Sequence, residues 1–197
     1  MNRLATTIVL LAALGPAAAA PALPQHLRDT GWDPGDAKLL RFTPQYPLWS
    51  DGAEKQRWLS LPPGRFIDAS NADAWVFPRG TKLWKQFSHA GRPVETRFIE
   101  RLADGSWRFA AYVWNDDGSD AMLAPERGIP ALPAPTAPGG RYAVPSRGDC
   151  GACHGSTAVP VLGFGAVQLS ADLRTLTARG WLRGLPPALL AAPPRIP

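Results

Sequence analysis

The two cysteines of this 197-residue chain stand three positions apart, and a histidine follows the second one directly. The segment runs Cys150-Gly151-Ala152-Cys153-His154. Two thiols at this spacing lie along one turn of chain and can both add to the vinyl groups on one edge of a porphyrin. The imidazole of the next residue can then bind the iron from the same side. The pattern therefore predicts one covalently attached haem c, with His154 as the proximal iron ligand.

Other chemistries use the same residue types. A zinc site needs four protein ligands, and this segment offers three with no second Cys/His pair elsewhere. A structural disulfide would close a loop too short to stabilise much. A thiol–disulfide redox pair stays open, because Cys-Gly-x-Cys is also a redox sequence. Against it, few residues remain after Cys153 to complete a thioredoxin-type sheet.

No motif in the sequence identifies the second iron ligand, on the distal side of the haem. Small all-helical cytochromes c use a methionine downstream of the motif, and here none follows it. Three side chains remain candidates for the distal position, and each also has a plainer interpretation. Met122 could be an ordinary half-buried side chain, His89 is expected at an exposed hairpin tip, and Lys85 could reach solvent or pair with an acid. An open or water-occupied position is the fourth alternative.

Arg57 belongs to an aromatic-rich block that also contains Trp49, Asp51 and Trp58. A guanidinium can bind a haem propionate through two parallel hydrogen bonds. Arg57 is therefore a candidate pocket residue. The alternative is an exposed arginine on a turn packed by aromatic side chains.

The N-terminus has the layout of a secretory signal peptide. The apolar run Leu4–Leu14 follows a positive residue and precedes a stretch of small residues. We expect residues 1–22 to be removed, with cleavage after Ala19 or Ala22. The remaining chain, 23–197, would then act in the periplasm or outside the cell. We expect no transmembrane segment in it, because no apolar run approaches the roughly 20 residues that a span requires.

Composition narrows the function further. The length fits one domain, and the eight tryptophans indicate a real apolar core. The net charge of +5 comes mostly from dispersed arginines, with no basic run, so we expect no nucleic-acid partner. A positive protein favours an acidic redox partner.

The pattern of apolar residues predicts an α+β fold. In residues 81–88, Leu83, Lys85 and Phe87 fall on one face of an extended strand and the intervening residues on the other. Residues 95–102 and 107–114 are further extended runs separated by turn residues. We predict an antiparallel sheet of about four strands with few short helices, followed by a haem-bearing C-terminal segment. The prolines at 130–140 predict a stiff, extended connector, and those at 186–197 a loose tail.

An ordered set of short blocks resembles a family of secreted bacterial proteins of unknown function that carry a single C-x-x-C-H. The blocks are Tyr46 to Ala53, Arg57-Trp58, Phe77 to Thr81, Lys85 to Phe87, Glu95 to Arg97, Tyr112 to Asn115, Asp120-Ala121, Tyr142 to Ser146, Asp149 to Gly155, Leu162-Gly163 and Gln168-Leu169. The resemblance implies haem c and a redox setting without an established reaction. Some relatives are fused to or paired with quinoprotein-type sugar dehydrogenase domains, which makes such a dehydrogenase a candidate redox partner.

A second resemblance is to cytochrome P460 and the beta-type cytochromes c′. It rests on the pattern Pro-x-Gly-Thr-x-x-x-Lys at 78–85, an antiparallel sheet and a C-terminal C-x-x-C-H. That group binds one haem beside a curved sheet and leaves the distal side open to small ligands. In the P460 branch a lysine is cross-linked to the porphyrin, and Lys85 is the residue to test for that role.

Three functions follow from these patterns. The first is a one-electron carrier that serves a dehydrogenase. The second is a haem protein that binds, oxidises or reduces nitric oxide, hydroxylamine or peroxide. The third is a haem-free thiol–disulfide redox protein. Whether the chain is an enzyme stays open at this point.

Overall fold

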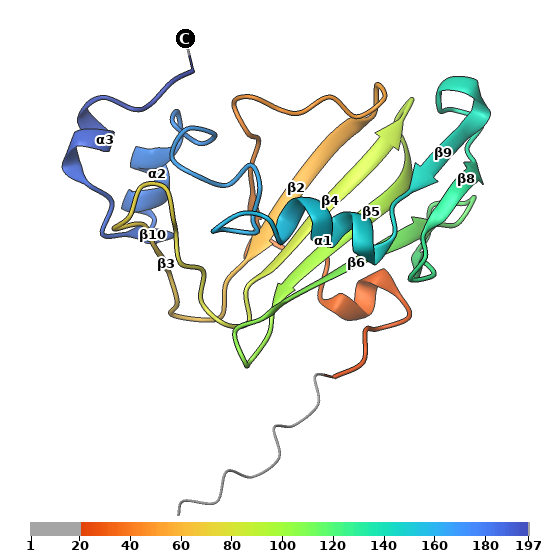
Figure 1. Cartoon of the computed structure of the whole chain (residues 1–197), viewed down its shortest axis with the longest axis horizontal. Helices are drawn as coiled ribbons and strands as arrows, with labels where there is room; N and C mark the ends of the chain where they lie inside the picture. Colours follow the sequence, from red (N-terminus) through yellow and green to blue (C-terminus); the bar gives the residue numbers. More distant parts are fainter. Residues whose placement is uncertain (1–20, 197) are drawn as a thin grey trace, which may run out of the picture.

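The computed structural model describes residues 21–196. The expected signal peptide, residues 1–22, lies almost wholly outside this range. The described chain is mostly strands with a few short helices, so the predicted α+β class is confirmed. Figure 1 shows one large sheet at the centre, with smaller elements gathered at its two ends.

The central sheet has six antiparallel strands in the order β1-β2-β4-β5-β6-β7. The strands are β1 (Leu40–Arg41), β2 (Glu54–Ser60), β4 (Lys82–His89), β5 (Arg92–Arg101), β6 (Trp107–Trp114) and β7 (Ala121–Leu123). The predicted number of about four was therefore wrong. The edge strands β1 and β7 are too short to show alternation, and β2 begins with four polar residues that hide its pattern.

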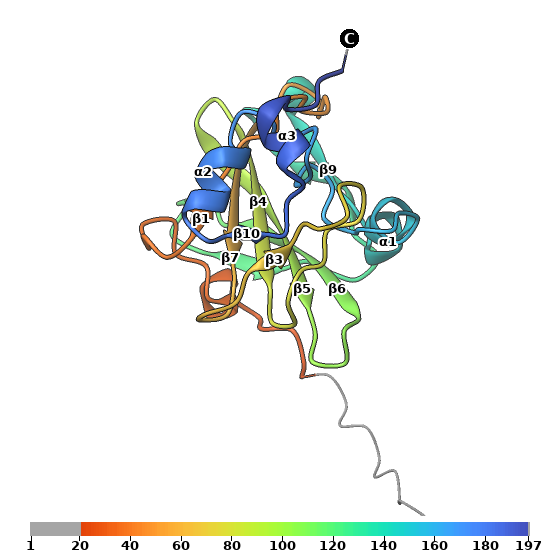
Figure 2. The same cartoon turned by 90° about the vertical axis from the view of Figure 1, so that its left-hand side faces the viewer.

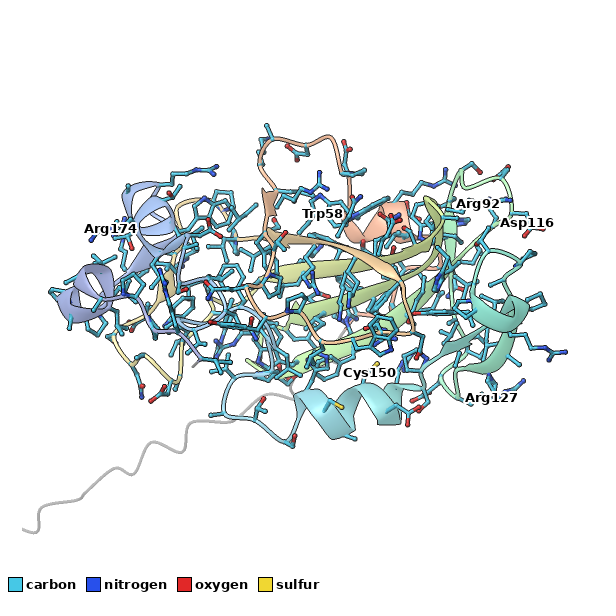
Figure 3. The ribbon with its side chains drawn as sticks, turned by 90° about the horizontal axis from the view of Figure 1, so that it is seen from above. Trp58, Arg92, Asp116, Arg127, Cys150 and Arg174 are labelled. Carbon is cyan, nitrogen blue, oxygen red and sulfur yellow. The ribbon has the colours of Figure 1, made fainter. Side chains whose placement is uncertain are left out.

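The two faces of the sheet bury different parts of the chain. On the first face, Trp58, Trp84 and Phe98 are cross-strand neighbours and are covered by the N-terminal segment, including the 3-10 helix η1 (Leu27–Thr30). The indole of Trp84 donates a hydrogen bond to the Thr30 hydroxyl at 2.8 Å. The opposite face, called here the motif face, carries the side chains that alternate with these. Figure 3 shows Trp58 and Cys150 on opposite sides of the sheet.

The predicted connector at 130–140 is part of a hairpin. It contains β8 (Ile129–Pro133) and the 3-10 turn η2 (Pro138–Gly140), and β8 pairs with β9 (Arg141–Val144). Proline lacks an N–H, but a two-stranded ribbon leaves one edge of each strand without a partner, so proline is tolerated there. The hairpin packs apolar side chains against Phe87 of the motif face. The hairpin is followed directly by α1 (Arg147–His154).

The C-terminal part packs with β3 (Ile67–Asp68) in a second core at the other end of the sheet (Figure 1, Figure 2). Its elements are α2 (Leu173–Ala178), β10 (Leu182–Arg183), which pairs in parallel with β3, and α3 (Pro187–Ala191). The predicted loose tail was wrong for 187–191, because Leu189 and Leu190 of α3 pack against this core. Burial of their apolar surface stabilises α3, although the proline-rich composition of this segment did not indicate a helix.

Candidate functional site

The cysteine motif lies on α1, which starts with a capping box. The Asp149 backbone N–H donates to the Ser146 hydroxyl at 3.0 Å, and the Ser146 N–H donates to the Asp149 carboxylate at 2.9 Å. Two of the N–H groups that a helix start leaves unpaired are thus satisfied. The helix lies across the motif face (Figure 1, Figure 3). Cys150 is half-buried, Cys153 is exposed, and neither forms a disulfide.

His154 ends α1 and is held by the loop that follows. Its Nδ1 atom lies 2.5 Å from the carbonyl oxygen of Pro160. Because a carbonyl only accepts, Nδ1 must carry the proton, and the lone pair is left on Nε2. The ring lies against Phe109 of β6, with centroids 5.2 Å apart. Burial lowers the pKa of His154, so the neutral imidazole that binds metals is favoured.

A cavity of about 320 Å³ adjoins Cys153 and His154. Its floor is the motif face, and its other walls come from residues 42–50 and 161–163. The loop 44–50 is fixed where the Tyr46 N–H donates to the Gln168 side chain at 2.9 Å and where Lys55 donates to the Leu48 carbonyl. The apolar lining is Phe42, Leu83, Ile99, Val161 and Leu162, with Trp49 at the rim. This volume is within the range of small-molecule and cofactor pockets.

Three cations line the floor of the cavity. Arg57 of β2 pairs in register with Lys85 of β4, and Lys85 pairs with Arg97 of β5. Directly opposite residues share a face, so the three side chains form one row across the sheet. Burial, followed by the charges of Arg57 and Arg97, lowers the pKa of Lys85 to about 8. Burial also lowers the pKa of Arg57.

Arg97 also belongs to a buried charged cluster. Its Nε and Nη2 atoms donate to the two carboxylate oxygens of Glu95 at 2.9 and 3.1 Å, and Glu95 is 0% exposed. The Tyr142 hydroxyl of β9 donates to the same carboxylate at 2.6 Å. Burial raises the pKa of the Tyr142 hydroxyl, so it stays a donor. The cluster ties the hairpin that leads into α1 to the sheet.

The structure brings only some of the predicted residues together. Arg57, Lys85, Cys153 and His154 line one cavity. His89 does not line it: the histidine closes β4, is 4% exposed, and packs edge-on against Tyr142. The expected exposed hairpin tip was therefore wrong, because the turn itself is Ala90-Gly91. Met122 is 46% exposed on the edge strand β7 and is also absent from the cavity lining.

Sequence reasoning missed Arg97, Glu95 and Tyr142 as site residues. Arg97 stands two positions from Glu95 on an alternating strand, which places both on one face. That spacing was a usable signal for an ion pair. Tyr142 carried no such signal, because its contact with Glu95 spans 47 positions.

The residues beside the cavity fit a covalently attached haem. The two thiols are not engaged in a disulfide, and the imidazole has one nitrogen bonded to a backbone carbonyl, a common arrangement for metal-binding histidines. The walls are largely apolar, and the floor holds cations with no acidic side chain in the lining. A haem carries two carboxylates and a large apolar surface, so both parts of the cavity suit it.

Comparisons with protein-family models, curated proteins and solved structures gave no match to this chain. Within residues 21–196, no three His, Cys, Asp or Glu side chains gather closely enough to hold a metal ion by themselves. The same part of the chain has no helix with the length and hydropathy of a membrane span.

Proposed function

We propose that this chain is a secreted or periplasmic protein that carries one covalent haem c and transfers single electrons. One observation carries most of the argument. His154 is oriented by its hydrogen bond to Pro160, and the cavity beside it adjoins the motif that would hold the porphyrin edge. Covalent attachment suits this site, because the cavity opens to the surface at Trp49, which is 81% exposed.

In this proposal each residue of the motif has a separate task. Cys150 and Cys153 would hold the porphyrin through thioether bonds, and His154 would bind the iron through Nε2. A bound haem would supply one-electron chemistry. The chain contributes the apolar walls that exclude water and the orientation of the imidazole, both of which tune a haem potential. We infer that the redox partner is an acidic protein, with a quinoprotein-type dehydrogenase as the first candidate.

A second candidate function is binding or turnover of a small molecule at the iron. Within the described chain, the cavity lining contains no methionine and no histidine besides His154. Lys85 is the only amine there, and its pKa of about 8 leaves part of it neutral near physiological pH. Nitric oxide, hydroxylamine or peroxide would be the ligands to test. This observation favours an open or lysine-bound sixth position.

The haem-free thiol function has less support. Redox-active cysteines have a lowered pKa, which raises the fraction of the reactive thiolate. Burial raises the pKa of the Cys150 thiol instead. We therefore rank thiol exchange last.

Absorption spectra of the haem-loaded protein separate the first two functions. The electron carrier predicts a low-spin reduced spectrum that carbon monoxide does not change. An open iron predicts a high-spin spectrum that carbon monoxide shifts. Lys85→Leu then tests lysine ligation, because leucine cannot bind iron, and Met122→Leu serves as the matched control, since Met122 lies away from the cavity. A spectrum altered by Met122→Leu and not by Lys85→Leu would contradict the site described above.

A further inference from the structure

Arg57, Lys85 and Arg97 form what is called here the cationic row. They are cross-strand neighbours on β2, β4 and β5, so consecutive members are about one strand spacing, roughly 5 Å, apart at the backbone. All three line the same cavity. Arg57 is 7% exposed, which is unusual for an arginine.

Two members of the row, Arg57 and Lys85, have no carboxylate of their own among the described residues. Glu95 is fully engaged by Arg97 and Tyr142. Within residues 21–196, neither Arg57 nor Lys85 takes part in an ion pair. Arg97 uses Nε and Nη2 on Glu95, and its Nη1 forms no further hydrogen bond with a described residue. A buried charge without a partner is costly, so this arrangement suits a ligand that brings the missing anion.

The geometry points to an oxoanion site formed by Arg57 and Lys85, with Arg97 fixed beside them by Glu95. The ligand is a carboxylate or another small oxoanion that enters the cavity beside His154. Guanidinium and ammonium groups bind such oxygens through charge-assisted hydrogen bonds. The oxygens come from one of two sources, the carboxylates of the haem or a free anion that binds in the cavity. Only the first source rests on the proposed function.

The test uses the haem-loaded protein and a buffer free of other oxoanions. Sulfate binding is measured by calorimetry, and the reduction potential is measured against pH. The row variants are Arg57→Leu, Arg57→Lys and Lys85→Leu. The controls are Arg65→Leu and Lys38→Leu, which remove exposed cations away from the cavity. Arg57→Lys keeps the charge, so it separates loss of anion binding from a folding defect.

Two results support the site and name its ligand. A free anion predicts sulfate binding that weakens at least tenfold in Arg57→Leu and Lys85→Leu, partly recovers in Arg57→Lys, and is unchanged in both controls. Haem carboxylates predict no sulfate binding. In that case the inflection of potential against pH moves upward by at least one pH unit in the row variants, because an unpaired carboxylate holds its proton more tightly.

The site is overturned if sulfate does not bind and the pH profile of the potential is the same in the row variants and the controls. If the chain carries no haem, the proposed function is wrong, and sulfate binding is then measured by the same calorimetry on the haem-free chain. Sulfate binding to that chain, lost in Arg57→Leu and kept in Arg65→Leu, would still support the row. Absence of sulfate binding there would refute it.

Discussion

The Nδ1 atom of His154 and the carbonyl oxygen of Pro160 are 2.5 Å apart, although His154 ends a helix and Pro160 lies in the loop beyond it. The bond fixes the tautomer and the direction of the ring before any ligand is present. The chain thus presents the ring beside a cavity that is also lined by the loop 44–50.

Replacement of His154 tests its proposed role as an iron ligand. We expect His154→Ala to keep thioether attachment through Cys150 and Cys153 and to lose the spectrum of an imidazole-bound iron. Imidazole added to the buffer should restore that spectrum, because it fills the space left by the side chain. His26→Ala is the control, since His26 bonds Asp120 away from the cavity. A spectrum unchanged in His154→Ala would exclude this residue as the ligand.

Loss of the helix cap should weaken the motif helix. Ser146→Ala removes the hydroxyl that accepts from the Asp149 N–H, and such caps are worth about 1 kcal/mol. We expect a loss of this size in urea unfolding, and a smaller haem-loaded fraction at equal expression because α1 presents both thiols. Ser106→Ala, which removes an exposed hydroxyl bonded to Asp104, is the matched control. Equal loading of the two variants would show that the cap has no part in attachment.

The buried cluster predicts unequal effects of two conservative changes. Glu95→Gln leaves the Arg97 guanidinium without its counter-charge and should cost about 3 to 5 kcal/mol of unfolding free energy. Tyr142→Phe removes one hydrogen bond and should cost about 1 kcal/mol. Chemical denaturation of both variants provides the comparison. Similar losses in the two would mean that the Arg97–Glu95 ion pair contributes no more to stability than the single Tyr142 hydrogen bond.

The lowered pKa of Lys85 should make the unfolding free energy rise with pH. Its pKa is about 8 in the folded chain and 10.5 as the reference value, so between these pH values the unfolded chain holds more protons. The unfolding free energy therefore rises with pH through this window, and the penalty of the charged amine is complete below pH 8. In the haem-free chain, Lys85→Met should be more stable than the parent by about 1 to 3 kcal/mol at pH 7.

The difference between Lys85→Met and its parent should shrink towards zero by pH 10.5. Tyr112, whose pKa burial raises to about 12, titrates in both chains and cancels from the comparison. Lys38→Met, at an exposed lysine, is expected to change nothing at either pH. A stability gain that stays constant from pH 7 to 10.5 would assign it to apolar packing rather than to the charge of Lys85.

The sequence was sufficient for the central strands of the sheet. Alternation over 81–88 and the turn at Asn115 to Gly118 placed β4 and the end of β6 within a residue or two. Strand geometry alone sends successive side chains to opposite faces, so this signal can be recognised without knowledge of tertiary contacts. It failed for β8, where prolines suggested a linker, since pairing with β9 depends on tertiary contacts with Phe87 that no local pattern encodes.

A site residue could be predicted only where the neighbouring sequence identifies it. The motif names Cys150, Cys153 and His154 by spacing alone. Lys85 and Arg57 were chosen for an apolar strand face and an aromatic block, and they share one cavity because β2 and β4 pair in register. The acceptor for His154 could not be chosen from sequence, because any backbone carbonyl has the same chemistry. Pro160 holds that position through the path of the loop.

The central claim is covalent haem at Cys150 and Cys153, and one measurement tests it most directly. The mature chain is expressed with a haem c attachment system, denatured, and examined by intact mass and by haem absorbance. We predict the mass of the chain plus one haem, with the Soret band retained after denaturation, and the chain mass alone for Cys150→Ser/Cys153→Ser. A parent chain without added mass or Soret absorbance, made beside a cytochrome that is loaded in the same cells, would contradict the account.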